Sequence, residues 1–315
     1  MTIQKLLTII LTAHNCGEFL EATLASVDAA VGQNHDEIEF IFINDSSIDN
    51  THEILKKYQG KFPCTQVYQV NYKNIGKVRN FGISKSHGQY ITMIDGDDCI
   101  LPGSYAEIMA FLKAKKPDLL LTQLNEVYDD KKKPQQWPGL NAQRLTQPDT
   151  IKKFLQHKQI KAHFIGQFIK REGLIAHPFP EFHCYEDAYL FPTILKNSNV
   201  IYFSTVSNYL YYKRKNSLST QIDQEKVSLL VLATQAMDKE FGSAYQDLTA
   251  CHWLNIFLRY RKNISNPTIY QEVVKRLCQI NKFRFLFNSS IRLSFKRKYL
   301  TALRMIKKEQ MINVQ

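Results

Sequence analysis

The chain has 315 residues, of which 44% are hydrophobic and 22% charged, and its formal net charge is +12 at pH 7. This composition is ordinary for a soluble globular protein with one large domain, or with one domain and a smaller appendage. The six cysteines are widely scattered without a C-x-x-C pair, which argues against a zinc site or a disulfide framework and favours free thiols in a reducing compartment.

The first predicted element is a buried strand in the stretch LLTIILTAHN, residues 6–15. Its apolar run is much too short to span a bilayer. The N-terminus also lacks the basic start and the small-residue cleavage site of a signal peptide. We therefore expect a cytoplasmic protein.

Helices and strands then alternate through the first part of the chain. We predict helices over 17–31, 50–62 and 73–88, and strands over 38–43, 64–70 and 89–94. This alternation predicts an α/β fold with a mostly parallel, Rossmann-like sheet covered by helices.

Polar side chains follow three of the predicted strands, in the stretches TAHN, NDSSIDN and DGDD. Ligands of such sheets bind just beyond the carboxyl ends of the strands, so these stretches are expected to meet. Asp95, Asp97 and Asp98 fall within four positions, and like charges this close disfavour ionisation unless a cation is present. A solvated turn is the alternative for this stretch alone, but three polar strand ends favour a metal site.

The rest of the chain is less regular until its last third. Glu186 and Asp187 precede an apolar helical stretch, a β-rich segment follows over 200–212, and the pattern is helical from about residue 228. We predict a domain boundary near residue 220, which separates a domain of residues 1–220 from a helical, basic region of residues 221–315.

Six motifs in order resemble the family 2 inverting glycosyltransferases with the GT-A fold. They are TIILTAHNCGEFLEATLASV, FIFINDSSIDNT, NIGKVRNFGI, YITMIDGDD, YEDAYL and YYKRKNSLS, and the likeness covers roughly residues 3–220. The resemblance implies transfer of a sugar from a nucleotide-diphosphate sugar, a UDP-sugar in our interpretation, to an acceptor hydroxyl. It places the acceptor side at about residues 100–220.

The resemblance assigns the donor side to the first four motifs. It makes Asp97 the ligand of Mg²⁺ or Mn²⁺, which prefer hard oxygen ligands, and places Asp95 near the ribose or the metal. Asp98 is left with two roles, assistance at the metal or capping of the next turn. Asp45 resembles the family residue that binds the base, although Ser46 replaces the usual glycine and disfavours a positive φ there.

Further nucleotide positions are implied by the first and third motifs. Ala13 and Asn15 are expected in the nucleotide pocket. NIGKVRN resembles a Gly-x-x-x-Arg-Asn variant, which implies nucleotide-binding roles for Gly76, Arg79 and Asn80. A surface helix with a solvated arginine is the alternative.

The acceptor side is carried by the last two motifs. YED resembles the family's acidic pair, which implies that Asp187 is the base that removes the acceptor proton. Glu186 is expected to orient the acceptor or to hold Asp187 in place. One cation of Lys213, Arg214 and Lys215 is expected to close over the diphosphate, and we select Arg214.

The C-terminal region predicts an anionic partner. Residues 275–308 contain eleven Lys and Arg and no Asp or Glu, with aromatic and aliphatic residues interleaved. Such helices lie well on anionic membrane surfaces, so we expect peripheral association with the inner face of the cell membrane. A helical subdomain packed on the catalytic domain is the alternative, and nucleic acid ranks last because no recognised binding motif accompanies the charge.

The sequence thus predicts a metal-dependent hexosyl- or N-acetylhexosaminyltransferase with a bacterial surface glycan as acceptor, such as capsule, O-antigen or lipooligosaccharide, free or lipid-linked. A nucleotidyltransferase is disfavoured, because TAHNCGEFL has one glycine and no basic residue where that class carries a Gly-rich basic loop. A non-catalytic membrane- or glycan-binding protein that retains the fold is the other alternative.

Overall fold

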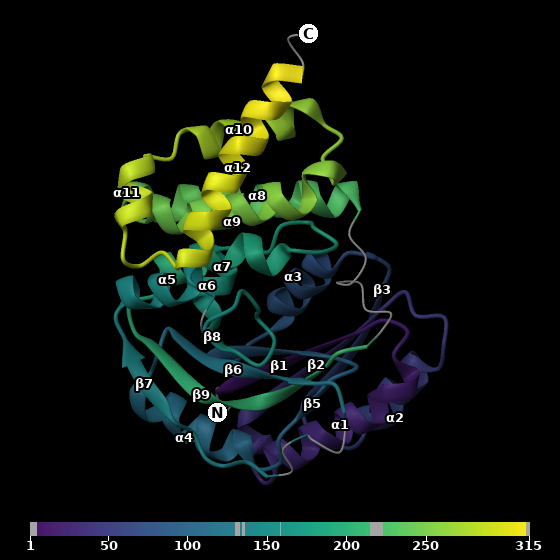
Figure 1. Cartoon of the computed structure of the whole chain (residues 1–315). Helices are drawn as coiled ribbons and strands as arrows, with labels where there is room; N and C mark the ends of the chain where they lie inside the picture. Colours follow the sequence, from purple (N-terminus) through teal and green to yellow (C-terminus); the bar gives the residue numbers. More distant parts are fainter. Residues whose placement is uncertain (1–4, 130–132, 134–135, 158, 215–222, 313–315) are drawn as a thin grey trace.

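The computed structural model describes residues 5–129, 133, 136–157, 159–214 and 223–312 (Figure 1). Within these residues the frame is a sheet of nine strands with the order β3-β2-β1-β4-β8-β6-β9-β5, and β7 pairs with β9. The strands are β1 (Leu7–Ala13), β2 (Ile38–Asp45), β3 (Thr65–Val70), β4 (Tyr90–Asp95), β5 (Cys99–Ile100), β6 (Leu119–Val127), β7 (Ala142–Leu145), β8 (Phe168–Lys170) and β9 (Ile201–Tyr212).

The sheet is mostly parallel, as the alternation of elements predicts. β3, β2, β1 and β4 run parallel to one another, β8 is antiparallel to its neighbours β4 and β6, and β6 runs parallel to β9. Every residue of β1 and β2 is buried, which is why both strands read as continuous apolar runs rather than as alternating ones.

Helices cover both faces of the sheet (Figure 1). One face carries α1 (Gly17–Val31), α2 (Thr51–Gln59) and α4 (Ser104–Lys115), which pack on Ile9, Leu11 and Phe42. The other face carries α3 (Ile75–Lys85), α5 (Gln147–Leu155), α6 (Arg171–Ala176) and α7 (Glu186–Lys196), which pack on Ile10 and Ile43. The alternation of side chains along each strand sends neighbouring residues to opposite faces.

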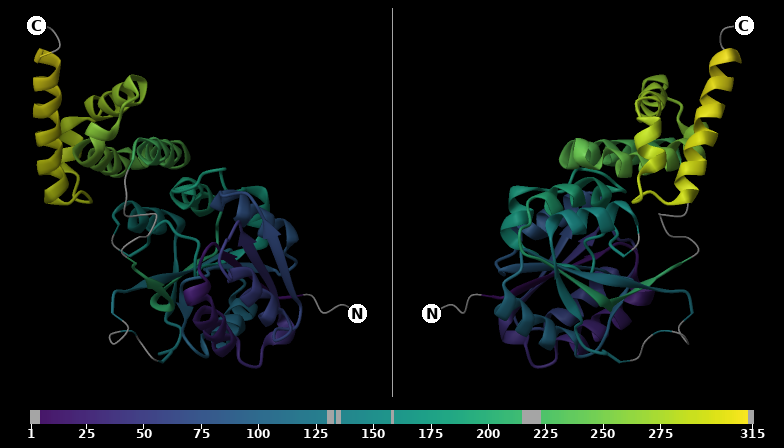
Figure 2. Two further views of the ribbon diagram at one scale, coloured as in Figure 1. Left: turned by 90° about the vertical axis from the view of Figure 1, so that its right-hand side faces the viewer. Right: turned by 60° about the vertical axis from the view of Figure 1, so that its left-hand side comes forward.

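A second helical layer follows the sheet part of the chain. It contains α8 (Gln224–Phe241), α9 (Gln246–Tyr260), α10 (Pro267–Cys278), α11 (Lys282–Phe287) and α12 (Leu293–Ile312). Figure 2 shows this layer stacked beyond α5–α7, on the side of the sheet away from α1, α2 and α4. One hydrophobic cluster runs from Ile10 in β1 through Phe191 in α7 to Phe257 in α9 and Tyr299 in α12.

The predicted helical C-terminal region therefore shares a core with the sheet part. The predicted boundary at residue 220 lies in 215–222, outside the described residues, and stays a prediction. No helix in the described part of the chain is both long enough and apolar enough to cross a membrane.

The register of the parallel strands brings their carboxyl ends together. Thr12 at the end of β1 pairs with Ile43 of β2 and with Asp95 of β4, and Asp45 of β2 pairs with Val70 of β3. The three polar stretches predicted from the sequence thus begin at one edge of the sheet, which is where ligands of parallel sheets bind.

Candidate active site

The acidic stretch after β4 is held by its neighbours in the sheet. The Thr12 hydroxyl donates a 3.2 Å hydrogen bond to Asp95 Oδ1, and the backbone N–H of Asp95 donates to the hydroxyl of Tyr209 at 3.1 Å. Gly96 packs so closely that an added Cβ would lie 2.7 Å from Cys16 Sγ. The stretch is therefore a built part of the fold and not a loose surface turn.

Asp98 is fully buried and anchors β9. Its carboxylate accepts hydrogen bonds from the Tyr209 hydroxyl at 2.7 Å and from the backbone N–H of Tyr212 at 2.8 Å. Burial and the neighbouring charges of Asp95 and Asp97 raise the pKa of Asp98 to about 8. The suggestion that Asp98 caps the following turn is wrong, because both oxygens are engaged with β9.

Asp97 faces outward and pairs with Arg214. Nη1 of Arg214 donates to Asp97 Oδ2 at 2.6 Å, and the guanidinium lies 3.9 Å from the ring centroid of Phe19. Burial and the charge of Asp95 raise the pKa of Asp97, against the opposing effect of Arg214. Arg214, the residue predicted to bind the diphosphate, thus contacts Asp97, the residue predicted to bind the metal. Lys215, another candidate for binding the diphosphate, lies outside the described residues.

The acidic stretch offers oxygen ligands for a hard divalent cation. Among the described residues, no three His, Cys, Asp or Glu side chains form a ready metal cage. Mg²⁺ and Mn²⁺ sites often use one or two carboxylates, with phosphate oxygens and water as the other ligands. Asp97, half-exposed, together with the adjacent Asp95, fits that donor set, whereas Asp98 is already occupied by Tyr209 and Tyr212.

The loop after β2 is organised by the Asp45 carboxylate. Asp45 Oδ1 accepts hydrogen bonds from the backbone N–H groups of Tyr72 at 2.7 Å and Lys73 at 3.1 Å. Ser46 adopts φ +58°, so it takes the left-handed conformation that favours glycine, and its hydroxyl donates to Asp45 Oδ1 at 2.9 Å. Serine thus adopts a glycine-like backbone conformation here although it is less comfortable for serine, and the local departure expected from this replacement is not seen at Ser46.

Asn15 supports the same loop from β1. Its backbone N–H donates to Ser47 Oγ, and its side-chain Oδ1 accepts from the N–H of Ile48, both at 2.9 Å. His14 Nδ1 donates to the carbonyl oxygen of Asp45 at 2.6 Å. Ala13 is buried in β1 opposite Asn44. These predicted pocket residues lie together, and their contact with a nucleotide stays a prediction.

Arg79 connects the two groups of acids. Its guanidinium is almost fully buried, and Nη1 donates to Glu186 Oε1 at 2.7 Å and also to Asp187. Nη2 lies 3.8 Å from Asp95 Oδ1. The end of β4 and the start of α7 therefore meet at one arginine. The alternative of a solvated Arg79 on a surface helix is wrong.

The acid pair is electrostatically perturbed. Burial and the charge of Asp187 raise the pKa of Glu186 to about 8, against the effect of Arg79. Burial also raises the pKa of Asp187, again against Arg79. The backbone N–H of Phe164 donates to Asp187 Oδ2 at 3.2 Å. Both oxygens of Asp187 thus have a fixed donor, and perturbed carboxylates of this kind concentrate at functional sites.

Gly76 and Asn80 have structural contacts that the motif did not predict. An added Cβ on Gly76 would lie 2.0 Å from the carbonyl oxygen of Pro180, so only glycine allows this approach. Asn80 donates to the carbonyl oxygen of Phe179 and accepts from its N–H, both at 2.9 Å. Both residues hold segment 179–182 beside α3, and their predicted nucleotide contacts stay untested.

Two aromatic residues at the site were missed from the sequence. Tyr209 bridges Asp95 and Asp98, and Phe19 lies under Arg214. Tyr209 stands in a tyrosine-rich stretch that reads only as a strand, and Phe19 falls in an amphipathic pattern that reads as core. No local signal marks either residue for the site.

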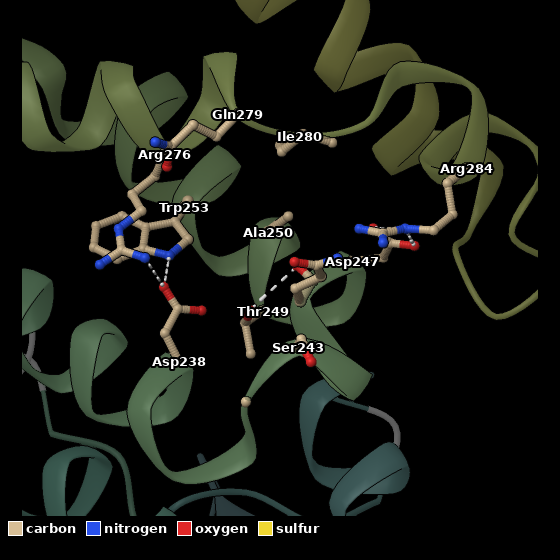
Figure 3. Close-up of a pocket in the computed structure, with 12 residues that line it drawn as sticks. Asp238, Ser243, Asp247, Thr249, Ala250, Trp253, Arg276, Gln279, Ile280 and Arg284 are labelled. Carbon is tan, nitrogen blue, oxygen red and sulfur yellow. Dashed lines mark hydrogen bonds and ion pairs between the residues drawn. The ribbon is translucent and has the colours of Figure 1, made fainter.

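A cavity of about 240 Å³ lies elsewhere, among α8, α9, α10 and α11 (Figure 3). Its polar groups bind one another: Arg284 donates to Asp247 at 2.8 Å, and Asp238 accepts from Trp253 Nε1 at 2.8 Å and pairs with Arg276 at 3.6 Å. The acids of the sheet edge do not line this cavity. We assign it no part in the chemistry described below.

The sequence matches known proteins over most of its length. The model of the family "Glycosyl transferase family 2" matches residues 8–173, which is more than half of the chain. The chain is 26% identical over 247 residues to chondroitin synthase from Pasteurella multocida, a match that covers 76% of this chain and 24% of the synthase. It is 26% identical over 283 residues to hyaluronan synthase from Pasteurella multocida, which covers 87% of this chain and 27% of the synthase. The chain thus spans about a quarter of the length of these two relatives.

The structure matches residues 1–349 of TarS from S. aureus, solved in complex with UDP-GlcNAc. The TM-score is 0.69 at 19% sequence identity, with 96% of this chain and 92% of the TarS chain covered. This likeness confirms the predicted fold, that of the GT-A glycosyltransferases.

Proposed function

Because the chain belongs to glycosyl transferase family 2, we propose that it transfers a sugar from a UDP-sugar to a hydroxyl group of a glycan, with inversion at the anomeric carbon. The observation that carries this proposal is the position of Arg79 between Asp95 and the pair of Glu186 and Asp187. Arg79 thus brings the acid assigned to the donor side close to the acid pair assigned to the acceptor side, so that both substrates could meet at this point.

The donor would bind across the carboxyl ends of β1, β2 and β4. Asp45, fixed by the backbone amides of residues 72 and 73, is the acceptor we assign to the base. The complex of TarS with UDP-GlcNAc supports a uridine nucleotide, since that protein shares the fold. Arg214 would turn from Asp97 to the diphosphate once the donor is bound.

Asp97 would hold Mg²⁺ or Mn²⁺, with Asp95 as its neighbour. When bound there, such a cation would supply positive charge to neutralise the leaving diphosphate. Arg214 donates to the Asp97 carboxylate in the structure and would have to release it for a metal to bind there. The hydrogen bond from Tyr209 to Asp98 links the acidic stretch to β9 without involving Asp97.

Asp187 would accept the proton of the attacking hydroxyl. Arg79 and the Phe164 amide orient its two oxygens, and each oxygen keeps a lone pair for the acceptor proton. Arg79 also stabilises the ionised form, which a base needs, against the burial that raises the pKa of Asp187. Glu186 accepts the other hydrogen bond of Arg79 Nη1 and so fixes the orientation of the guanidinium.

The acceptor class we propose is a bacterial surface glycan, such as capsule, O-antigen or lipooligosaccharide, free or lipid-linked. The names of the chondroitin and hyaluronan synthases support a polysaccharide product. Whether the donor sugar is a hexose or an N-acetylhexosamine depends on the shape of the sugar pocket. A cytoplasmic enzyme at the inner membrane face would meet both the UDP-sugar and a lipid-linked acceptor.

The proposal is tested with a thermal-shift screen of nucleotide sugars with and without Mn²⁺, followed by UDP-sugar hydrolysis without acceptor. A donor that binds the native state raises the melting temperature of the protein. Hydrolysis of that UDP-sugar would then show that the chain is catalytically active. Binding without any turnover would favour the non-catalytic alternative. Release of pyrophosphate from a nucleoside triphosphate would favour a nucleotidyltransferase.

A further inference from the structure

We propose that α11 and the outer face of α12 bind the surface of a membrane rich in anionic phospholipid. The proposal concerns residues outside the candidate active site and does not depend on the transferase assignment. It rests on three observations: exposed aromatic side chains, a helix face of unpaired cations, and an absence of acids along the segment.

The first observation is the exposure of two phenylalanines on α11. Phe283 is 73% exposed and Phe287 is 83% exposed, whereas Phe285 between them is fully buried against Tyr299 at a ring distance of 5.0 Å. Positions i and i+4 share one helix face, so the two exposed rings project together, away from the packed face. Leu293 at the start of α12 is 63% exposed and adds a third apolar side chain to this junction.

The second observation is the division of α12 into two faces. Tyr299, Ala302 and Ile306 are buried against the helical layer. The opposite face is exposed and carries Leu293, Arg297, Thr301, Arg304 and Lys308, at the three- and four-residue spacing of one helix face. Figure 2 shows α12 at the outer edge of the helical layer, away from the sheet.

The third observation is the charge of this surface. In the described part of the chain, the carboxylates form no ion pair with Arg297, Arg304 or Lys308. The nearest acid in sequence, Glu309, is directed to Arg261 and Tyr270 on the inner side. No acidic residue occurs over 275–308, so this segment itself contributes only positive charge to the surface.

Apolar tips beside basic side chains fit a lipid surface better than the other partners. Phenylalanine and leucine enter the boundary between head groups and acyl chains, while Lys and Arg remain at the anionic head groups. A second copy of the chain would bring the same positive charge and repel. Nucleic acid would use the cations but would leave the exposed leucine without a favourable contact.

The test is flotation of the full chain with vesicles of phosphatidylcholine alone or mixed with phosphatidylglycerol. We expect binding to the mixed vesicles, weakened by salt because the attraction is screened. The variant R297Q/R304Q should lower vesicle partitioning about fivefold for each cation removed. The variant F283S/F287S should abolish flotation.

The matched controls are K56Q/K115Q and I175S, which remove exposed charges and an exposed apolar side chain from other elements. They should float like the unmodified chain. UDP-sugar hydrolysis in solution should be unchanged in all variants, so failure of the transferase proposal would be seen separately. Equal flotation of the unmodified chain and F283S/F287S, equal binding to both vesicle types, or preference for RNA over vesicles would each overturn the proposal.

Discussion

The buried guanidinium of Arg79 donates a 2.7 Å hydrogen bond to the carboxylate of Glu186, 107 positions later in the chain. Replacement of Arg79 by methionine leaves Glu186 and Asp187 buried without a cation. We expect the free energy of unfolding to fall by about 3 kcal/mol at pH 8, the size found when one partner of a buried pair is removed. The loss should be smaller at pH 5, because Glu186, with a pKa of about 8, is then protonated and uncharged. Urea unfolding at both pH values measures it. An equal loss at both would show that packing, and not charge, explains the effect.

Asp187 is expected to supply the general base. The variant D187N should lower the rate of sugar transfer by about 10²- to 10⁴-fold, the usual contribution of a positioned base. Its thermal shift with UDP should be unchanged, because the donor side is intact. The control is E186Q, which should retain more activity than D187N. Full turnover by D187N would remove Asp187 from the mechanism.

Glu186 should make stability fall as the pH rises. Its pKa is about 8 in the folded protein and near 4.5 when unfolded, so the folded state holds the proton more tightly. Its contribution is fully present below pH 4.5 and is lost as the pH rises through 8. In this window the free energy of unfolding of the unmodified chain should fall by up to about 1.4 kcal/mol per pH unit relative to E186Q. Parallel pH profiles of the two proteins would contradict a raised pKa.

Arg214 and a divalent cation should compete for Asp97. Since a partly exposed ion pair contributes at most about 1 kcal/mol, R214Q should bind Mn²⁺ up to about fivefold more tightly without nucleotide. The same variant should bind UDP more weakly in the presence of Mn²⁺, because the diphosphate loses a cation. D97N should lose Mn²⁺ binding. Calorimetric titration of the three proteins measures this, and identical Mn²⁺ affinities would exclude Asp97 as a ligand.

Ser46 should tolerate glycine but not valine. Its φ of +58° is costly for a β-branched residue, so S46V should lower the free energy of unfolding by about 1–3 kcal/mol and weaken UDP binding through Asp45. S46G keeps the backbone conformation without strain and should bind UDP nearly as well. Thermal shifts with and without UDP compare the two variants. Equal losses in both would assign the effect to the hydroxyl instead of the backbone.

The sequence predicts the first half of the sheet because local patterns there agree with the tertiary structure. β1 and β2 are buried on both faces, so their apolar runs cannot be mistaken for surface segments. β6, β8 and α5 were not predicted. β8 has only three residues, too few for a periodic signal, and β6 is buried at one end and partly exposed at the other.

The sequence names residues of the candidate site, but it does not predict the contacts among them. Motifs name Asp97, Asp187 and Arg79, but no motif indicates that Arg79 joins the two groups of acids. The hydrogen bonds that contradict a capping role for Asp98 come from β9, more than 100 positions away in the chain. Contacts at such separations depend on strand register and helix packing, which a short motif does not encode.

The absence of a side chain at position 76 makes this site sensitive to the smallest substitution. A single methyl group there would meet the Pro180 carbonyl oxygen at 2.0 Å and would force segment 179–182 outward. Asn80 clamps Phe179, whose ring lies 5.4 Å from the Arg79 guanidinium, so the displacement would reach the cation that aligns the acids. An alanine at position 76 would thus disturb the alignment of Asp95, Glu186 and Asp187 through the backbone of segment 179–182.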